Sequence, residues 1–272
     1  MLVAVAARAV GGEQLRLHRA AAVTEQNLAL MRSGGGYWWL LLSGFAEPVF
    51  YLLAIGWGVG DLVGDVAVGG GRTVPYLTYV GPALLAAAAM NGSIIESGVN
   101  FFVKITGMRF YDAVLNTPVT PVDIAFGELA WAMVRGGLYS GAFLAMMAGM
   151  GLIGPWSALA TVPAALLVGF AFGGVGLVIA TIMRVFEDYD YISIVQTALF
   201  LFSGTFVPVA DYPRAAQVLV ELTPLYHAVE LVRGIALDQI GWSLLGNAAY
   251  LLALMVGSLV LASRRLMRKF RV

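Results

Sequence analysis

Long apolar stretches alternate with short polar or glycine- and proline-rich segments along the whole chain. A helix needs about 20 mostly apolar residues to cross the hydrocarbon core of a bilayer. Six stretches approach that length: residues 37–59, 76–95, 124–150, 158–183, 192–207 and 244–263. The pattern predicts an all-α, polytopic integral membrane protein with six transmembrane helices, in which residues 1–272 form a single transmembrane domain.

The segment before the first span, residues 1–36, predicts a lead followed by a short helix at the membrane surface. Charges such as Arg8 and Glu13 interrupt the lead, so it does not have the unbroken apolar run of a cleaved secretory signal. Residues 20–36 are compatible with a helix that stops at three glycines, because glycine weakens a helix interior. This composition suits an interfacial helix, and it suits a solvated linker helix equally well.

The segment after the fifth span, residues 208–242, is helix-compatible but is broken at Pro213 and Pro224. A broken, partly polar segment is tolerated at membrane depth where protein covers it or where it lines a cavity. We therefore expect two short helices here that form a re-entrant hairpin on the external side.

Composition supports the assignment to a membrane. The 272 residues are 60% hydrophobic and 12% charged, with a mean hydropathy of +0.84, whereas an ordinary soluble domain is about one quarter charged. A formal net charge of zero argues against a nucleic-acid footprint. The chain has no cysteine and two histidines, which excludes thiolate metal sites and makes a multi-histidine site a poor interpretation, so we expect no bound metal.

Lysine and arginine positions predict the orientation, because cytoplasmic loops carry an excess of them near the ends of spans. One side of the predicted topology has twelve: Arg8, Arg16, Arg19, Arg32, Lys104, Arg109, Arg184, Arg264, Arg265, Arg268, Lys269 and Arg271. The other side has Arg72, Arg214 and Arg233. We therefore expect both termini to be cytoplasmic, in the plasma or inner membrane of a bacterial-type cell.

Charged and polar residues at membrane depth are costly, so each is a candidate for the substrate path or for gating. The candidates are Glu47, Glu96, Glu128, Arg135, His227, Glu230 and Arg233. Glu128 and Arg135 share a helix face but are too far apart for direct contact, so each needs a partner on another helix. Structural pairing or a place at the headgroup edge is the favoured interpretation of Glu96 and Glu128. Glu47 is equally compatible with structural pairing and with substrate contact.

His227, Glu230 and Arg233 recur at three-residue spacing and can share one stripe of a helix. The favoured interpretation is a stripe of mutually hydrogen-bonded polar side chains that closes one end of the substrate path. The alternative is a proton relay. Glycine pairs such as Gly137–Gly141 and Gly169–Gly173 allow helices to approach closely, more plausibly within the chain than at a dimer face.

Catalytic motifs are missing from the sequence. No GxxxxGK[ST] phosphate-binding loop, HExxH pair or GxSxG elbow occurs. We therefore expect the chain itself not to be an enzyme and to bind no cofactor.

A mixed segment, "MRFYDAVLNTPVTPVDIAFGE" (residues 108–128), separates the second and third apolar stretches. Pro118 and Pro121 interrupt any helix before the chain re-enters lipid, since proline disfavours helix for the residue before it. Asp123 is well placed at the start of the third span, because a carboxylate suits a helix N-terminus.

Four stretches of the sequence carry a resemblance to a known family. "LFSGTFVPVADYP" and "TPLYHAVELVRG", with Ser203, Gly204, Pro208 and Pro224 among their signature residues, look like the C-terminal signature of type-2 ABC exporter permeases. "EPVFYLLAIGWGVG" and "YDAVLNTPVTPVDIAFGELAWAMVRG" are similar to the branch that holds nodulation-factor-export and daunorubicin-resistance permeases. The resemblance extends from about residue 25 over nearly the whole chain.

The resemblance implies a fold and partners. It implies an interfacial helix at about residues 23–32 and a coupling helix at about residues 104–116 that docks on a cytoplasmic ATPase. The coupling contacts would be Arg109, Phe110, Tyr111, Asp112 and Leu115. It also implies a second permease, either a copy or a paralogue, and two ATPase subunits that bind ATP and magnesium in place of this chain.

The function expected from these observations is the permease subunit of an ATP-driven exporter of a drug, lipid or glycolipid-like molecule. A proton-coupled secondary transporter of small amphipathic molecules, working through Glu47 and His227, is the alternative. A membrane enzyme acting on lipid ranks last, because no compact catalytic constellation occurs.

Overall fold

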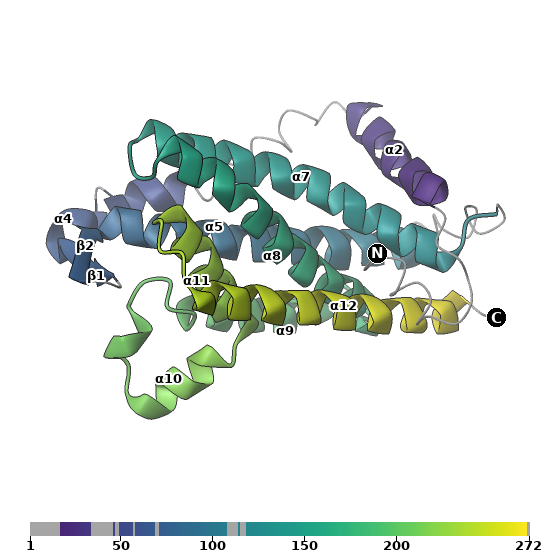
Figure 1. Cartoon of the computed structure of the whole chain (residues 1–272). Helices are drawn as coiled ribbons and strands as arrows, with labels where there is room; N and C mark the ends of the chain where they lie inside the picture. The colour runs from purple at the N-terminus through teal and green to yellow at the C-terminus, as the bar shows by residue number, and fades with distance from the viewer. Residues whose placement is uncertain are drawn as a thin grey trace.

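The computed structural model describes residues 17–33, 46, 49–56, 58–68, 71–107, 114 and 118–270. Long helices that run roughly along one axis form its body (Figure 1). They are α5 (Tyr76–Ile94), α7 (Pro121–Gly149), α8 (Pro155–Ile182) and α12 (Trp242–Phe270). Helix α2 (Leu17–Ser33) lies at one end of this bundle and a β-hairpin lies at the other, so we call these the α2 end and the hairpin end.

The chain of α5 continues well beyond the predicted span of residues 76–95. Wide π-helical turns follow at η2 (Ile95–Asn100) and η3 (Val103–Gly107), and the whole stretch Tyr76–Thr106 qualifies as one candidate span. Glu96 therefore lies inside a continuous helical rod and does not close it, which corrects the sequence-based boundary. Single π-turns within helices frequently mark functional sites, because they re-aim side chains.

Helix α8 lies in the centre of the bundle, where it packs against α5, α7 and α12. Glycines make this packing possible. A Cβ added to Gly173 would lie 2.5 Å from Leu129 Cδ1, and one added to Gly176 would lie 2.2 Å from Ser97 Oγ. Gly169 also faces a neighbouring helix, as predicted, whereas the space beside Gly141 is open.

Helix α2 packs across the start of α7, which places it beside the bundle at the α2 end (Figure 1). Its Thr24 Oγ1 donates a hydrogen bond of 3.0 Å to the carbonyl of Gly127. A Cβ on Gly127 would lie 2.6 Å from the Cβ of Val23, so only glycine lets the two helices approach this closely. The predicted helix at residues 20–36 is thus present as α2, with its Ala20, Val23 and Asn27 side buried.

Helix α7 begins where its sequence predicts. Thr120 and Asp123 form a capping box, in which each side chain accepts a hydrogen bond from the other residue's backbone N–H. Pro121 occupies the first turn, where its missing N–H costs nothing.

Three shorter helices follow α8: α9 (Asp188–Leu201), α10 (Arg214–Glu221) and α11 (Pro224–Ala236), with a 3-10 turn, η4 (Val209–Asp211), before α10. The predicted fifth span, residues 192–207, is wrong in its C-terminal half, because α9 ends at Leu201 and non-helical chain follows. The two predicted proline breaks are confirmed as helix starts, since α10 begins directly after Pro213 and α11 begins at Pro224. Helix α11 is largely buried against α5, α8 and α12, whereas α10 projects from the bundle (Figure 1).

A small β-hairpin was not predicted. Short helix α4 (Gly60–Val63) leads into β1 (Asp65–Val68), which pairs antiparallel with β2 (Arg72–Pro75) in a register that places Val66 opposite Val74. The sequence signal was present, since two β-compatible stretches flank a run of glycines.

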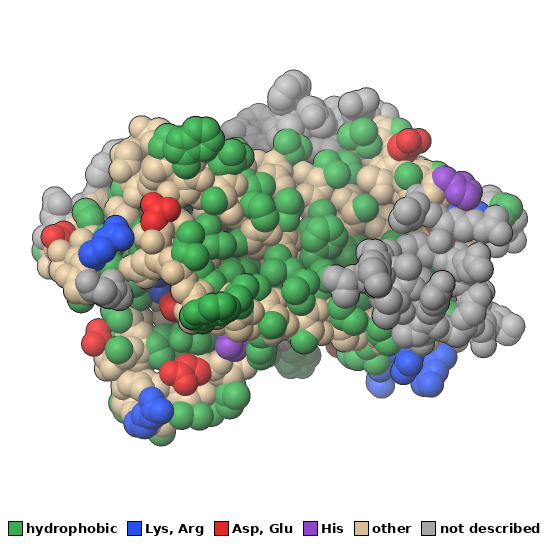
Figure 2. Space-filling model, viewed as in Figure 1, with side chains coloured by type: hydrophobic (Ala, Val, Ile, Leu, Met, Phe, Trp, Pro, Cys, Tyr) green, Lys and Arg blue, Asp and Glu red, His purple; other side chains and the backbone are tan. Residues whose placement is uncertain are grey.

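Three described helical stretches are long and apolar enough to cross a membrane: Tyr76–Thr106, Pro155–Ile182 and Trp242–Lys269. Helix α7 has 29 residues but includes Asp123, Glu128 and Arg135, and α9 has 14 residues. Most of the predicted first span, residues 37–59, lies outside the described residues, although residues 49–56 are helical. Hydrophobic side chains cover the middle of the visible face and charged ones gather toward its ends (Figure 2).

Candidate functional site

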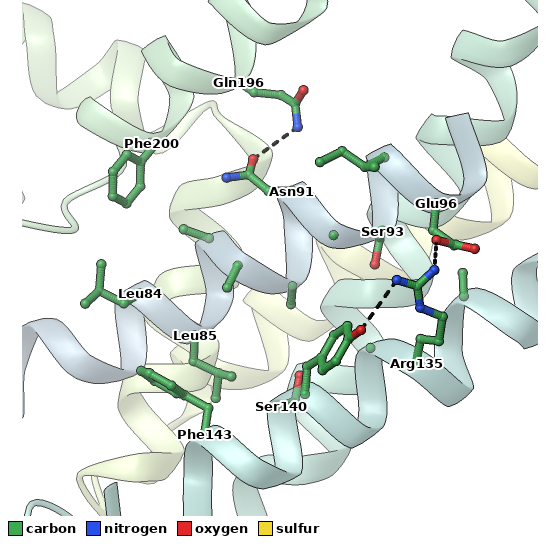
Figure 3. Close-up of a pocket in the computed structure, with 18 of the residues that line it drawn as sticks. Leu84, Leu85, Asn91, Ser93, Glu96, Arg135, Ser140, Phe143, Gln196 and Phe200 are labelled. Carbon is green, nitrogen blue, oxygen red and sulfur yellow. Dashed lines mark hydrogen bonds and ion pairs between the residues drawn. The ribbon is translucent and has the colours of Figure 1, made fainter. Parts of the chain in front are cut away.

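A cavity of about 730 Å³ lies between α5, η2, α7 and α9. One part of its lining is apolar, with Leu84, Leu85, Phe143 and Phe200 (Figure 3). The other part is polar, with Asn91, Ser93, Glu96, Arg135, Ser140 and Gln196 (Figure 3). A cavity divided in this way matches a molecule that has an apolar body and a polar group.

Glu96 and Arg135 form an ion pair in the wall of the cavity. The Glu96 carboxylate also accepts hydrogen bonds from Trp131 Nε1 at 3.0 Å and from Asn100 Nδ2 at 2.9 Å. Arg135 Nη2 donates to the Tyr139 hydroxyl at 3.4 Å, and its buried Nε has no partner among the described residues. Glu96 therefore has three hydrogen-bonding or ionic partners on η2 and α7.

A second ion pair, Lys104–Glu128, lies nearer the α2 end at 2.7 Å. Glu128, whose side chain is 1% exposed, also accepts a hydrogen bond from Asn27 Nδ2 at 2.7 Å. The Asn27 side-chain oxygen accepts from Lys104 Nζ at 2.9 Å. These three side chains, from α2, η3 and α7, form a closed polar junction that we call the Lys104 junction.

The two ion pairs follow from the antiparallel arrangement of two helical rods. Glu96 and Lys104 follow each other along the helical stretch that continues α5, and their partners Arg135 and Glu128 follow each other in the reverse direction along α7. Each of the two helical stretches therefore contributes one acidic and one basic side chain to the contact. The prediction that Glu128 and Arg135 need partners on other helices is confirmed, and the partners are Lys104 and Glu96.

A hydrogen bond between two neutral side chains joins α9 to α5 at the cavity. Gln196 Nε2 of α9 donates to Asn91 Oδ1 of α5 at 3.1 Å (Figure 3). Gln196 is the buried residue of α9, and its own side-chain oxygen is buried without a partner among the described residues.

Arg233 of α11 clamps three segments together and lies away from the cavity. It donates hydrogen bonds to the carbonyls of Tyr79 at 3.2 Å and Gly204 at 2.8 Å, and it pairs with Glu230 at 3.1 Å. Its guanidinium carbon lies 3.8 Å from the centre of the Tyr79 ring, a cation–π geometry. The side chain is buried, so these contacts explain how a charge is tolerated there.

The predicted stripe of His227, Glu230 and Arg233 divides into two separate contacts. Glu230 pairs with Arg233, as three-residue spacing allows, whereas His227 Nδ1 lies 2.8 Å from Asn247 Oδ1 on α12. The His227 ring also stacks on Tyr250, with centroids 4.0 Å apart. Within the described residues the three side chains therefore form no single relay.

The signature residues shape the turn that follows α9 and the start of α11. Gly204 has φ +74°, a left-handed conformation that favours glycine, and a Cβ there would lie 2.7 Å from Val209 Cγ2. Ser203 Oγ lies 2.7 Å from Thr205 Oγ1. Pro208 precedes η4, and Pro224 opens α11, whose Thr223 cap accepts from the Tyr226 N–H. These roles are local and structural.

Several predicted site residues lie outside the described residues. They are Glu47, Arg109, Phe110, Tyr111, Asp112 and Leu115. The structure in turn brings in Asn27, Asn91, Trp131 and Gln196, which the sequence did not single out. The only available signal was that each is a polar or amphipathic side chain within or beside an apolar helix. Within the described ranges, no three His, Asp or Glu side chains gather as a metal ion requires.

Comparisons with known proteins agree with this architecture. Residues 26–237 match the family model described as "ABC-2 type transporter". The chain is 34% identical over 206 residues to nodulation protein J of Sinorhizobium fredii, covering 74% of this chain and 75% of that protein. It is 30% identical over 200 residues to nodulation protein J of Rhizobium meliloti, covering 73% and 74%.

A third relative, nodulation protein J of Azorhizobium caulinodans, is 27% identical over 77% of this chain and 83% of its own length. The family match covers well over half of the chain, and the resemblance found in the sequence motifs is thereby confirmed. The chain belongs to the ABC-2 type transporter family and is a membrane permease of the ABC exporter class.

Proposed function

We propose that the chain provides the membrane path for an amphipathic molecule, a drug, a lipid or a glycolipid-like compound, that is exported at the expense of ATP. The observation that carries the proposal is the cavity between α5, α7 and α9, which is apolar on one side and polar on the other. A separate cytoplasmic ATPase binds ATP and magnesium. A second permease, either a copy of this chain or a paralogue, completes the path.

The proposed topology has six spans with both termini in the cytoplasm and a re-entrant hairpin of α10 and α11 on the external side. The charge asymmetry supports the orientation. The burial of α11 among α5, α8 and α12 supports a re-entrant segment, since irregular chain at membrane depth must be covered by protein.

The chain has no cysteine, so single cysteines test this topology directly. Leu62 and Arg268 are both exposed and lie toward opposite ends of the bundle. An impermeant thiol reagent added to intact cells should label Leu62→Cys and leave Arg268→Cys unlabelled. Labelling of both from outside would exclude the topology.

We further propose that residues 104–116 couple the path to the ATPase, with Arg109, Phe110, Tyr111, Asp112 and Leu115 making contact. The Lys104 junction supports this role because it ties the start of this segment to α2 and α7. A displacement of the segment by the ATPase would then be transmitted to α7. The ion pair between Arg135 of α7 and Glu96 would transmit it further to the side chains that line the cavity. Truncating an interface hot spot typically costs at least about 2 kcal/mol, near thirtyfold in affinity.

The coupling role is tested by Phe110→Ala, Tyr111→Ala and Asp112→Lys. Each should insert normally and should copurify less well with the ATPase or transport less per ATP. Wild-type copurification and wild-type transport per ATP for all three would contradict the role.

The test of the overall function is reconstitution in proteoliposomes with a candidate P-loop ATPase. ATP hydrolysis should rise with members of a panel of lipids and amphipathic drugs, and the same molecules should move across the bilayer. An ATPase whose P-loop lysine is replaced should abolish both effects. Transport that survives this replacement and follows a proton gradient would instead support a secondary transporter.

A further inference from the structure

We infer that Asn91 and Gln196 form a recognition site for an uncharged hydrogen-bonding group, a hydroxyl or an amide, on the transported molecule. The inference rests on the proposed function, because it assigns a ligand group to the same cavity. It goes further by naming two residues and the charge state that they select.

The two side chains reach toward each other from opposite walls. Asn91 is on α5 and Gln196 is on α9, and one hydrogen bond of 3.1 Å joins them (Figure 3). Both residues line the cavity. Gln196 is 6% exposed, and its Oε1 has no partner among the described residues. A buried acceptor without a partner costs free energy, and a ligand that donates to it removes that cost.

Amide chemistry determines which groups fit. A side-chain amide has one accepting oxygen and one donating NH2, and a single bond between two amides leaves an acceptor on one side and a donor on the other. Turning both amides round reverses the direction of the bond but leaves the same two functions free. The pair therefore complements a group that both donates and accepts, as a hydroxyl or a secondary amide does.

The surrounding charges favour a neutral ligand. Of the described residues that line the cavity, Glu96 and Arg135 carry formal charge, and they are paired with each other. A charged headgroup at Asn91 would lose its hydration without gaining a free counter-charge from these described side chains. The apolar side chains Leu84, Leu85 and Phe143 lie beyond Asn91 and can take an alkyl or aromatic body (Figure 3).

Helix α9 is held so that a ligand can enter at this point. Among its 14 residues Gln196 is the buried one, whereas Tyr191, Ile194 and Val195 are exposed. An outward shift of α9 would loosen Ile192, Leu199 and Phe200, which are partly buried against the core, and would leave the exposed side of the helix unchanged. The bond between Gln196 and Asn91 is then the polar contact that a ligand exchanges for its own.

The experiment uses the full chain purified in mild detergent and four photo-crosslinking probes. Each probe has the same twelve-carbon tail with a diazirine, and the heads are a diol, an acetamide, a carboxylate and a trimethylammonium. Labelled peptides are mapped and quantified by mass spectrometry. Peptides of α5 and α9 should be labelled more by the diol and acetamide probes than by the two charged ones.

Variants then locate the recognition. Gln196→Leu and Asn91→Leu should each reduce labelling by the diol and acetamide probes about five- to tenfold, the range expected for about one good hydrogen bond. Gln196→Glu keeps the shape and an acceptor but adds a negative charge, so it should raise labelling by the trimethylammonium probe. Ile194→Leu, on the exposed side of α9, should label as wild type does.

The outcomes separate this inference from the proposed function. Equal labelling of α5 and α9 by all four heads, or unchanged labelling in both leucine variants, overturns the recognition site and leaves a cavity without head selectivity. Labelling of neither helix by any probe overturns the cavity as a path. Head selectivity without ATP-dependent movement of the same probes in proteoliposomes supports the site and contradicts the transport role.

Discussion

Helices α9 and α11 are close in sequence and similar in length, 14 and 13 residues, yet they are held in opposite ways. Helix α11 buries Leu225, Ala228, Val229 and Val232 completely, and Arg233 ties it to two other segments. Helix α9 buries Gln196 and leaves large apolar side chains exposed. Helix α11 is thus packed on several sides, whereas α9 packs through one edge with Ile192, Leu199 and Phe200 partly buried. We therefore expect α9 to be held less firmly than α11.

The first test of this difference replaces the central clamp of α11. In Arg233→Leu, the carbonyls of Tyr79 and Gly204 each lose a hydrogen bond from a charged donor, and such a bond is worth about 1.5–3 kcal/mol. The contact with the Tyr79 ring is lost as well, so we expect the free energy of unfolding to fall by roughly 4 kcal/mol. Denaturant unfolding in mild detergent, followed by tryptophan fluorescence, measures the change.

The matched variant on α9 is Gln196→Leu, which removes one neutral hydrogen bond and fills the space with apolar atoms. It should change the free energy of unfolding by less than about 1 kcal/mol. An equal loss of stability in the two variants would mean that α9 is as firmly held as α11.

The second test asks whether the Lys104 junction belongs to the firmly held part. Lys104→Met removes the cationic partner of the buried Glu128 carboxylate, which keeps its hydrogen bond from Asn27. Breaking a buried pair on one side costs about 3–5 kcal/mol, and the partial exposure of Lys104 places this case near 3 kcal/mol.

The double variant Lys104→Met, Glu128→Leu serves as its control. It should recover the part of the stability that the unpaired charge costs, because the buried Asn27 amide, which loses both partners, is neutral. If the double variant is as unstable as Lys104→Met, the loss comes from packing or from the Asn27 amide, and the ion pair is not what holds η3 against α7.

The third test concerns the central helix α8, against which α11 packs. Gly176→Ala would bring a Cβ within 2.2 Å of Ser97 Oγ and 3.1 Å of the Gly98 nitrogen, so Ser97 must give up its buried hydrogen bonds or the helices must separate. Overpacking of this kind costs typically about 1–3 kcal/mol. Gly141→Ala meets open space and should be neutral or should stabilise by up to about 1 kcal/mol through helix propensity. Thermal unfolding of both variants in one detergent measures the contrast.

The smallest effect is expected in the turn that leads into α9. Backbone hydrogen bonds, first from Arg184 N–H and then from Val185 N–H, hold the pKa of the Asp188 carboxylate below its ordinary value. Because this pKa is lower in the folded than in the unfolded chain, the ionised carboxylate stabilises the folded turn at every pH above the pKa of the unfolded chain. This contribution is lost as pH falls through the folded pKa.

Amide hydrogen exchange of Arg184 and Val185 measures this effect. After correction for the intrinsic exchange rate, the protection of the two amides should fall as the pH drops below about 4, the ordinary pKa of an aspartate. In Asp188→Asn the protection should not depend on pH in that range. The same pH dependence in Asp188→Asn would assign the protection to another group.

Much of the architecture followed from the sequence. Apolar length placed α5, α7, α8 and α12, because a rod of about 20 apolar residues has few stable environments other than lipid or a helical core. Local chemistry placed helix starts, as at Thr120 and Asp123 of α7 and at Pro224 of α11. These signals act over a few residues and do not depend on distant segments.

Other features depended on contacts between distant segments. The sequence indicated that Glu128 and Arg135 needed partners, but it could not identify Lys104 and Glu96. Choosing between partners requires the register of two helices, and π-turns at residues 95–100 and 103–107 change that register. The early end of α9 also escaped the apolar pattern, because the chain after Leu201 is fixed by a left-handed turn at Gly204 whose carbonyl accepts a hydrogen bond from the distant Arg233.

The cavity shows this division most clearly. Sequence alone determined that the chain is a helical membrane protein with costly polar groups at membrane depth. Composition and periodicity are enough for this, because they show which segments are stable in lipid and which need water. Only the tertiary structure decided that Asn91 and Gln196, 105 residues apart, would meet. A neutral amide in an apolar helix carries no local signal of its partner, because the free energy of its hydrogen bond exists only once two helices are packed.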